Sequence, residues 1–207
     1  MKQRKTVQEH AVSPVVGVML MLVVTIIIAA VVSAFAGGLS SGTQKAPQAS
    51  IEVKILSEAG NTMGGTNEYL MTFSQQSGEP ISTKDLNIIT YYKNKAGKIY
   101  KNTQTPTSTP TDLYGYGSTT RVPYISDARL GYSGNNPSKD FGNYSWKVGD
   151  VLSTGSSAGT ADILAINSTA TPHTILDSDF GPGSIVEVKI LHVPSGQYIY
   201  DREVTVQ

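Results

Sequence analysis

The chain has 207 residues, enough for one domain with a sizeable hydrophobic core or for two small domains. Its 16 basic and 16 acidic residues give a formal net charge of zero, so it lacks the basic surplus of a nucleic-acid-binding protein. It contains no cysteine, which excludes disulfide bonds, thiolate metal sites and a cysteine nucleophile. Charged residues make up only 15% of the chain, which favours extracellular β-structure over a charged cytosolic helical protein.

The N-terminus combines a basic flank with a long apolar run. Lys2, Arg4 and Lys5 precede residues 12–36, which include no charged side chain. A basic flank before an apolar run is typical of a membrane insertion signal. As a helix, this run would extend about 37 Å, which exceeds the roughly 30 Å hydrocarbon core of a bilayer. The run is therefore predicted to form a helix that can span a membrane.

Local signals place the ends of this helix. Ser13 followed by Pro14 suits its start, because a serine oxygen can cap free amides and proline at the first helical position loses no hydrogen bond. Gly37 and Gly38 suit its end, so we expect an apolar helix over residues 12–38. Its many β-branched residues weaken a helix in water but matter less in lipid. A helix that is apolar all round is expected to be covered all round.

Two simpler interpretations of the apolar run stay open. Ala34, Phe35 and Ala36 form an A-x-A pattern before Gly37, as in a secretory signal peptide that is removed. The apolar part of such a signal usually spans about 7–15 residues, and this run is longer. The second alternative is a plain single-pass anchor that keeps its leader.

The apolar run also carries a family pattern. Residues 11–21, AVSPVVGVMLM, with their apolar continuation to residue 36, resemble the N-terminus of archaeal type IV pilins. In that family a prepilin peptidase removes a short leader, the class III signal peptide, and the retained helix becomes the filament core. The resemblance implies a leader of residues 1–11 and a cleavage site between Ala11 and Val12. Val16 stands where bacterial type IV pilins usually carry glutamate, which favours the archaeal branch, and the Ser-Pro pair favours an adhesion pilus over a swimming filament.

The resemblance also implies a role and a set of partners. The chain would be a structural subunit, not an enzyme, that lies in the plasma membrane before assembly and in a cell-surface filament afterwards. Its partners would be other copies of the chain, a prepilin peptidase, an assembly ATPase and a membrane platform protein. No cofactor, metal or nucleic acid is expected. The alternative is a membrane-anchored surface binding protein that does not polymerise, or a minor pilin-like subunit.

Small residues within the apolar run are candidates for helix packing. Burying one large apolar side chain is worth about 1.5–3 kcal/mol, so exposing the whole helix to water would cost tens of kcal/mol. Small side chains four residues apart allow helices to approach closely in an apolar setting. The candidates are Gly17, Ala29, Ala30, Ser33 and Ala34.

The rest of the chain is predicted to form a linker and a β-rich head. Residues 39–49 are polar and proline-containing, which predicts a linker, and the head is expected over residues 50–207. Period-two alternation predicts strands at 51–55, 68–74, 86–93, 98–102, 184–193 and 197–206. Short strands between Gly- and Pro-containing turns predict an α+β chain whose head is an antiparallel β-sandwich or a partial barrel.

Long polar segments separate some of these strands. Residues 103–120 and 127–143 are rich in Thr, Ser, Pro, Gly and Asn, and they are predicted to be surface loops of the kind that often carry recognition. No second helix of any length is expected. Trp146 is predicted to fill the core. The segments around Gly78-Glu79-Pro80, Trp146 and residues 186–196 resemble the head pattern of archaeal pilins, more weakly than the N-terminus does.

The sequence offers no catalytic motif. The three histidines are His10, His173 and His192, and none belongs to an HExxH pattern or another paired spacing. His192 is interpreted as a structural strand residue. Asp177-Ser178-Asp179 partly resembles a calcium loop but lacks the distal glutamate, so a turn stabilised by aspartate is favoured.

Two surface features carry recognition hypotheses. Asn143 and Asn167 each begin an N-x-S/T triplet and are candidate N-glycosylation sites.

The chain has 11 tyrosines, part of which concentrate in its middle: Tyr91, Tyr92, Tyr114, Tyr116, Tyr124 and Tyr132. We interpret them as sheet and loop packing residues, with a sticky adhesive face as the alternative.

Overall fold

The computed structural model describes residues 14–40, 44–59, 68–166, 175 and 177–207. The chain divides into two compact units, Met1–Thr43 and Gln44–Gln207, which are described separately. The cleavage position between Ala11 and Val12 and the candidate sequon at Asn167 lie outside the described residues.

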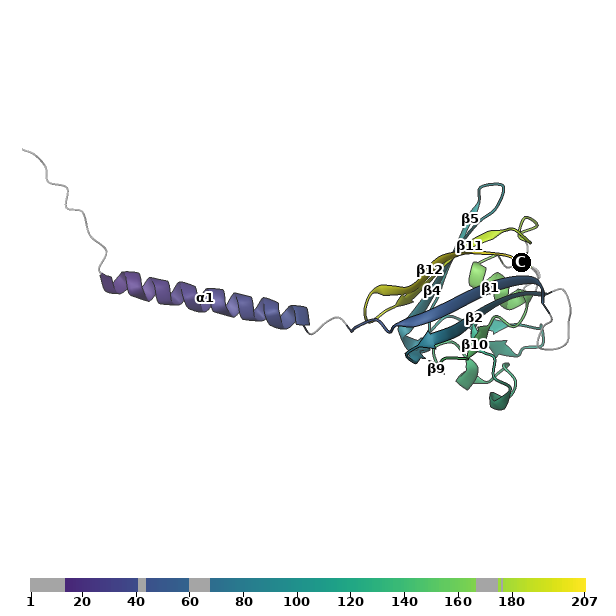
Figure 1. The fold of residues 1–207 in the computed structure, drawn as a ribbon, viewed down its shortest axis with the longest axis horizontal. Helices are drawn as coiled ribbons and strands as arrows, with labels where there is room; N and C mark the ends of the chain where they lie inside the picture. Colours follow the sequence, from purple (N-terminus) through teal and green to yellow (C-terminus); the bar gives the residue numbers. More distant parts are fainter. Residues whose placement is uncertain (1–13, 41–43, 60–67, 167–174, 176) are drawn as a thin grey trace, which may run out of the picture. The chain divides into compact units, whose positions relative to one another are not determined.

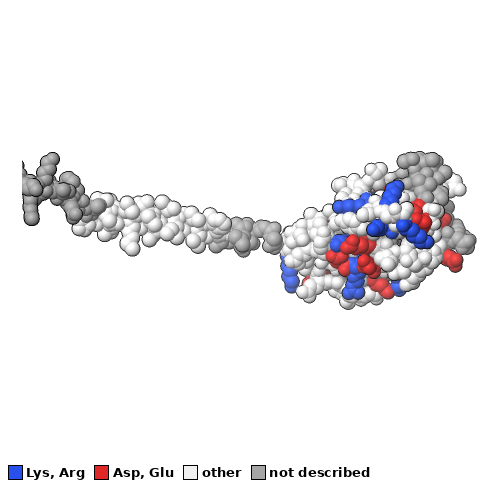
Figure 2. All heavy atoms as spheres, turned by 90° about the horizontal axis from the view of Figure 1, so that it is seen from above, with Lys and Arg blue, Asp and Glu red and all other residues white. Residues whose placement is uncertain are grey.

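The described part of the first unit is one helix, α1, which spans Pro14–Ser40 (Figure 1). Its segment Pro14–Phe35 is long and apolar enough to cross a membrane. Every side chain from residue 14 to residue 35 is exposed within the chain, and none is charged (Figure 2). The predicted apolar helix is thereby confirmed, and it continues past the two glycines to Ser40.

The second unit is built on two four-stranded antiparallel sheets. The first sheet has the order β1-β2-β10-β8, and its strands are β1 (Ala49–Ala59), β2 (Glu68–Gly78), β10 (Val151–Ser153) and β8 (Tyr124–Ile125). The second has the order β12-β11-β4-β5, and its strands are β12 (Gln197–Thr205), β11 (Ile185–His192), β4 (Leu86–Lys93) and β5 (Ile99–Gln104). Figure 1 shows them as two layers. The α+β class and the antiparallel, unclosed head are as predicted.

Among the described residues, the second unit also has two short ribbons and three turns of 3-10 helix. One ribbon pairs β3 (Ile81–Ser82) with β9 (Ser145–Trp146), and the other pairs β6 (Thr111–Asp112) with β7 (Thr119–Thr120). The 3-10 turns are η1 (Thr83–Asp85), η2 (Ala128–Leu130) and η3 (Pro137–Lys139). Both β6 and β7, and both η2 and η3, fall in segments expected to be plain surface loops.

Side-chain alternation on the strands builds the core. In β11, Val186, Val188 and Ile190 are fully buried, while the residues between them are partly exposed. The same alternation holds in β1 and β4, because a strand sends successive side chains to opposite faces. Trp146 is 1% exposed and belongs to this core, as predicted.

A short segment after β12 links the two sheets on one side. Ile55 of β1 forms a parallel bridge with Val206. The Ser57 amide donates to the Gln207 carbonyl at 2.7 Å, and the Gln207 amide donates to the Ile55 carbonyl at 2.9 Å. On the opposite side, β8 and β5 are the outer strands of their sheets.

The expectation of no second helix is wrong. Helix α2 spans Ser157–Leu164 and is capped by Ser156, whose Oγ accepts from the Gly159 amide. Six of its eight residues are buried, so its sequence, SAGTADIL, shows no alternation between a polar and an apolar face. Gly159 is required because a β-carbon there would collide with the Thr154 carbonyl. Tertiary packing, not helical periodicity, therefore creates α2.

Candidate functional site

Helix α1 is the first candidate site. Ala29 and Ser33 are four residues apart, as are Ala30 and Ala34, so each pair lies on one face of the helix. At Gly17, apart from its two chain neighbours and the backbone of the helix itself, no atom lies within 4 Å of the position that a β-carbon would take. These residues therefore provide narrow stretches on a helix surface that the chain itself leaves uncovered. Their packing against other helices stays a prediction.

Asn143 is exposed in a turn between η3 and β9. Its side-chain Nδ2 donates to the Pro137 carbonyl at 2.7 Å, and its backbone amide donates to the Asp140 carbonyl at 3.0 Å. Ser145, the third residue of the triplet, is also exposed. A modifying enzyme could thus reach the triplet, whereas Asn167 lies outside the described residues.

His192 and Asp177 hold turns. The Nδ1 atom of His192 lies 2.8 Å from Ser195 Oγ, and Ser195 Oγ also donates to the His192 carbonyl. Asp177 Oδ1 accepts from the Asp179 amide, and Asp177 Oδ2 accepts from Asn94 Nδ2, each at 3.0 Å. Within the described residues, no group of three or more His, Asp or Glu side chains could hold a metal ion.

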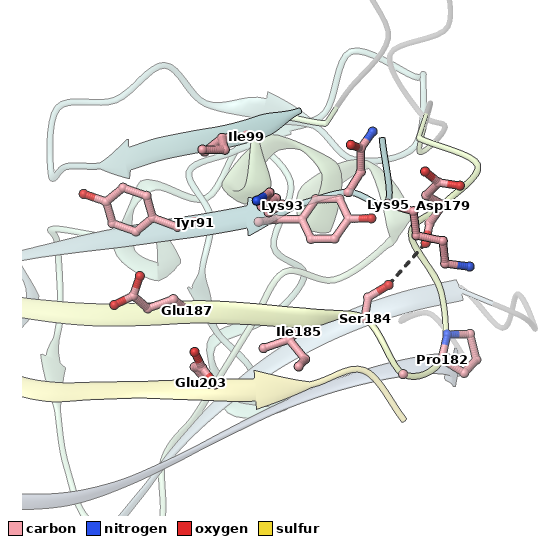
Figure 3. Close-up of a pocket in the computed structure, with 13 residues that line it drawn as sticks. Tyr91, Lys93, Lys95, Ile99, Asp179, Pro182, Ser184, Ile185, Glu187 and Glu203 are labelled. Atoms are coloured by element: carbon pink, nitrogen blue, oxygen red, sulfur yellow. Dashed lines mark hydrogen bonds between the residues drawn. The ribbon is translucent and has the colours of Figure 1, made fainter. Parts of the chain in front are cut away.

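One hollow of about 610 Å³ lies over the second sheet (Figure 3). Tyr91 and Lys93 come from β4, Ile99 from β5 and Glu187 from β11, and Asp179 lies on the adjoining turn. The dashed line in Figure 3 is the bond from Ser184 Oγ to the Asp179 carbonyl, at 3.3 Å. Charges of both signs are spread along this surface, and no single ligand chemistry stands out.

A second hollow, of about 760 Å³, is lined by four of the six tyrosines singled out from the sequence. We call it the tyrosine pocket. Its lining residues are Tyr114, Tyr116, Ser118, Tyr124, Ser126, Asp127, Ala128, Gly131, Tyr132, Ser133, Gly134 and Lys139. They all come from the stretch 114–139, which is mainly β7, β8, η2 and the loops around them. The two segments predicted as surface loops therefore meet here.

The tyrosines of this pocket have two different environments. Tyr124 is 1% exposed and packs in the core, as the packing interpretation predicts. Tyr116 and Tyr132 are 81% and 86% exposed, so core packing does not account for them. The adhesive alternative therefore fits these two residues better. Tyr91 and Tyr92 lie at the other hollow.

Two residues of the tyrosine pocket carry a charge, and both charged groups contact other groups of the chain. Asp127 pairs with Arg129 at 2.8 Å, and hydrogen bonds from Arg129 hold the pKa of the Asp127 carboxyl below its usual value. Lys139 is 4% exposed, and its Nζ donates to the carbonyls of Asp127 at 3.0 Å and Gly131 at 2.7 Å. Burial lowers the pKa of Lys139. The burial of Lys139 could not be predicted from the sequence, because a charged residue in a polar segment is normally exposed.

The fold and the candidate sites define a class of protein: a chain with one exposed helix apolar enough to cross a membrane, followed by a β-rich unit. Residues 10–51 match the family described as archaeal type IV pilin, N-terminal. The N-terminal segment of this chain is therefore similar to that of archaeal type IV pilins, and the resemblance predicted from the sequence is confirmed for this segment.

A relative from Archaeoglobus fulgidus, described as an uncharacterized protein, is 29% identical to this chain over 97 residues. The similarity covers 46% of this chain and 62% of the relative, so it extends over less than two thirds of that protein. No solved structure matches the chain.

Proposed function

We propose that this chain is the structural subunit of an archaeal type IV adhesion pilus and that it polymerises through α1. The observation that carries the proposal is the match of residues 10–51 to the pilin N-terminal family, because that segment includes the helix and the residues just before it. The pilin family is structural, so the proposal assigns no enzymatic reaction.

The exposure of α1 supports assembly. Fifteen large apolar side chains of this helix are exposed, among them Leu20, Ile27 and Phe35. At about 1.5–3 kcal/mol for each large apolar side chain, leaving them in water would cost tens of kcal/mol. Lipid covers the helix before assembly, and the helices of other copies cover it afterwards. The transfer avoids the cost of exposing the helix to water, because it exchanges one apolar surrounding for another.

The leader and the partners follow from the same proposal. Lys2, Arg4 and Lys5 keep the N-terminus on the cytoplasmic side of the plasma membrane until a prepilin peptidase cuts between Ala11 and Val12. An assembly ATPase and a membrane platform protein then drive the subunits into a cell-surface filament.

The N-terminus of the mature protein tests this proposal. The protein would be sheared from the surface of archaeal cells that express it and analysed by N-terminal sequencing. We expect a start at Val12. A start at Gly37 would instead support a secreted protein, and an intact leader would support a plain membrane anchor.

Polymerisation needs a second measurement. Electron microscopy of the sheared material, with an antibody against residues 68–166, should label filaments along their whole length. Label confined to a few points would indicate a minor subunit. Complete absence from filaments, together with recovery in the membrane fraction, would favour the non-polymerising surface protein.

N-glycosylation is a further part of the proposal. Asn143 is exposed, and its triplet is accessible; Asn167 is the second candidate. The intact mass of the surface protein should exceed the sequence mass by a glycan, and Asn143→Gln should remove one glycan unit. A mass equal to that of the unmodified chain would refute this part and leave the filament proposal untouched.

A further inference from the structure

The two most exposed tyrosines of the tyrosine pocket flank a hollow large enough for a small organic ligand. Pockets that take such ligands typically measure about 300–1,000 Å³, and this one measures about 760 Å³. Tyr116 and Tyr132 present most of their ring surface to solvent, whereas Tyr124, Ser133 and Lys139 are buried beneath. The pocket thus has a packed floor and an aromatic rim.

The loop that carries Tyr116 is held rigidly by one carboxylate. Asp112 Oδ1 accepts from the amides of Tyr114 at 3.2 Å and Gly115 at 2.9 Å, and its Oδ2 accepts from the amide of Gly117 at 2.7 Å. A carboxylate that accepts several amides fixes the backbone of a turn. The Tyr116 ring therefore projects from an ordered turn.

The loop that carries Tyr132 is held in a similar way. Lys139 Nζ donates to the Gly131 carbonyl, and Asn136 Nδ2 donates to the carbonyls of Leu130 at 2.7 Å and Tyr132 at 3.4 Å. The Asn135 amide donates to the Thr119 carbonyl at 3.0 Å, which connects this loop to β7. Both rims are thus preorganised, which lowers the entropy lost when a ligand binds.

The charges and polar groups of the pocket restrict the class of ligand. Asp127 is paired with Arg129, and Lys139 donates to two carbonyls, so the pocket offers little free charge to a phosphate or another strongly charged ligand. Ser118, Ser126 and Ser133 contribute hydroxyl groups that can donate or accept. A matching ligand is uncharged, has apolar faces for the tyrosine rings and carries many hydroxyl groups at its edges. A pyranose has this combination, since its C–H groups form faces that stack on aromatic rings.

We propose that the tyrosine pocket binds a neutral saccharide, with Tyr116 and Tyr132 as stacking residues. A segment of two or three sugar units fits a hollow of this size. The proposal goes beyond the filament function and does not depend on it, because binding in the pocket requires only the folded β unit.

The test is calorimetric titration of the full chain with defined sugars. The chain would be kept in a detergent without a sugar headgroup, so that the detergent does not compete. The neutral probes are maltotriose, cellotriose, mannotriose and chitotriose, and the acidic probe is trigalacturonic acid. We expect saturable binding of at least one neutral probe and none of the acidic one. Failure of all four neutral probes, or tighter binding of the acidic probe, overturns the proposal.

Variants locate the binding. Tyr116→Ala and Tyr132→Ala should each weaken binding of the responding sugar at least tenfold, and both residues are exposed enough that the fold should survive. Tyr198→Ala is the matched control, because Tyr198 is 51% exposed on β12 and does not line the pocket. An equal loss in the control, or unchanged binding in both pocket variants, would contradict the assignment. Filament formation by the pocket variants, observed separately, keeps this result distinct from that of the assembly test.

Discussion

Asp162 occupies an unfavourable position for a carboxylate. It lies near the C-terminal end of α2, where the helix dipole disfavours negative charge. Burial raises the pKa of its carboxyl, and the hydrogen bond that Thr111 Oγ1 donates to its Oδ2 at 2.6 Å opposes the rise. The folded state therefore binds a proton at this site more tightly than the unfolded state does.

This difference predicts a pH-dependent effect of Asp162→Asn. Because the folded-state pKa is raised, the stabilisation from Asp162 is fully present below the unfolded pKa and is lost as pH rises through the folded pKa. The asparagine carbonyl can still accept from Thr111 but does not ionise. The variant should therefore gain stability relative to the wild type as pH rises from about 3.5 to 7, with the difference levelling off above the folded pKa.

Thermal unfolding of both proteins across this pH range measures the effect. Thr111→Val serves as the internal control, because it removes the opposing hydrogen bond and keeps Asp162. The stability of this variant should depend on pH more strongly than that of the wild type. A difference between Asp162→Asn and wild type that stays constant with pH would contradict this account of Asp162.

At the scale of single elements, regular alternation was the reliable signal. Ile51, Val53 and Ile55 alternate with polar residues, and β1 indeed buries this side. The apolar run is confirmed as α1, and its composition alone indicates a helix that needs apolar surroundings. In both cases the arrangement of apolar residues within the segment itself indicates the type of element, so no distant contact is needed to predict it.

Elements that depend on tertiary contacts could not be predicted from a local sequence pattern. Helix α2 is buried on nearly all sides, so it has no periodic pattern. The loops of the tyrosine pocket are fixed by Asp112 and Lys139 through bonds to backbone groups. The sequence pointed to the tyrosines, but it could not separate Tyr124 in the core from Tyr116 on the rim. Asp112 before a glycine-rich stretch was the available signal for an ordered turn.

The small residues of α1 lead to a prediction about assembly. Replacing both Ala30 and Ala34 by leucine adds volume on one face of the helix while keeping it apolar. If this face lies against other helices in the filament, the added volume should prevent close approach and reduce the filament yield at least tenfold. The protein should still insert into the membrane, since leucine is as compatible with lipid as alanine.

Separate quantification of sheared filaments and of the membrane fraction checks this prediction. The matched control is the double variant Ile27→Leu with Val31→Leu, which has the same four-residue spacing but changes volume little. Normal filaments from the Ala30/Ala34 variant would show that this face is not packed closely, while loss from the membrane as well would point to failed insertion.

At the scale of the β unit, the two residues after β12, Val206 and Gln207, join the two sheets, and the hydrogen bonds to β1 are made by Gln207. Val206 follows β12 and is 2% exposed. Its amide donates to the Ser184 carbonyl, and its carbonyl accepts from the Gly183 amide, each at 2.9 Å. On its other side it bridges to Ile55 of β1. The two layers therefore share their backbone bonding here, whereas β8 and β5 are outer strands of their sheets.

Truncating the Val206 side chain should therefore destabilise the whole β unit. Val206→Ala keeps the backbone bonds but removes two buried methyl groups and leaves a cavity between the layers, so we expect the free energy of unfolding to fall by about 1.5–3 kcal/mol. Urea unfolding followed by tryptophan fluorescence is a suitable measurement, because Trp146 is buried in the same core. Val193→Ala is the matched control: Val193 is 50% exposed, so its replacement should change the stability by no more than about 0.5 kcal/mol. Equal effects of the two substitutions would mean that the Val206 side chain does not stabilise the packing of the two sheets. The stability of the unit would then come from other buried side chains, such as those of β1, β4 and β11.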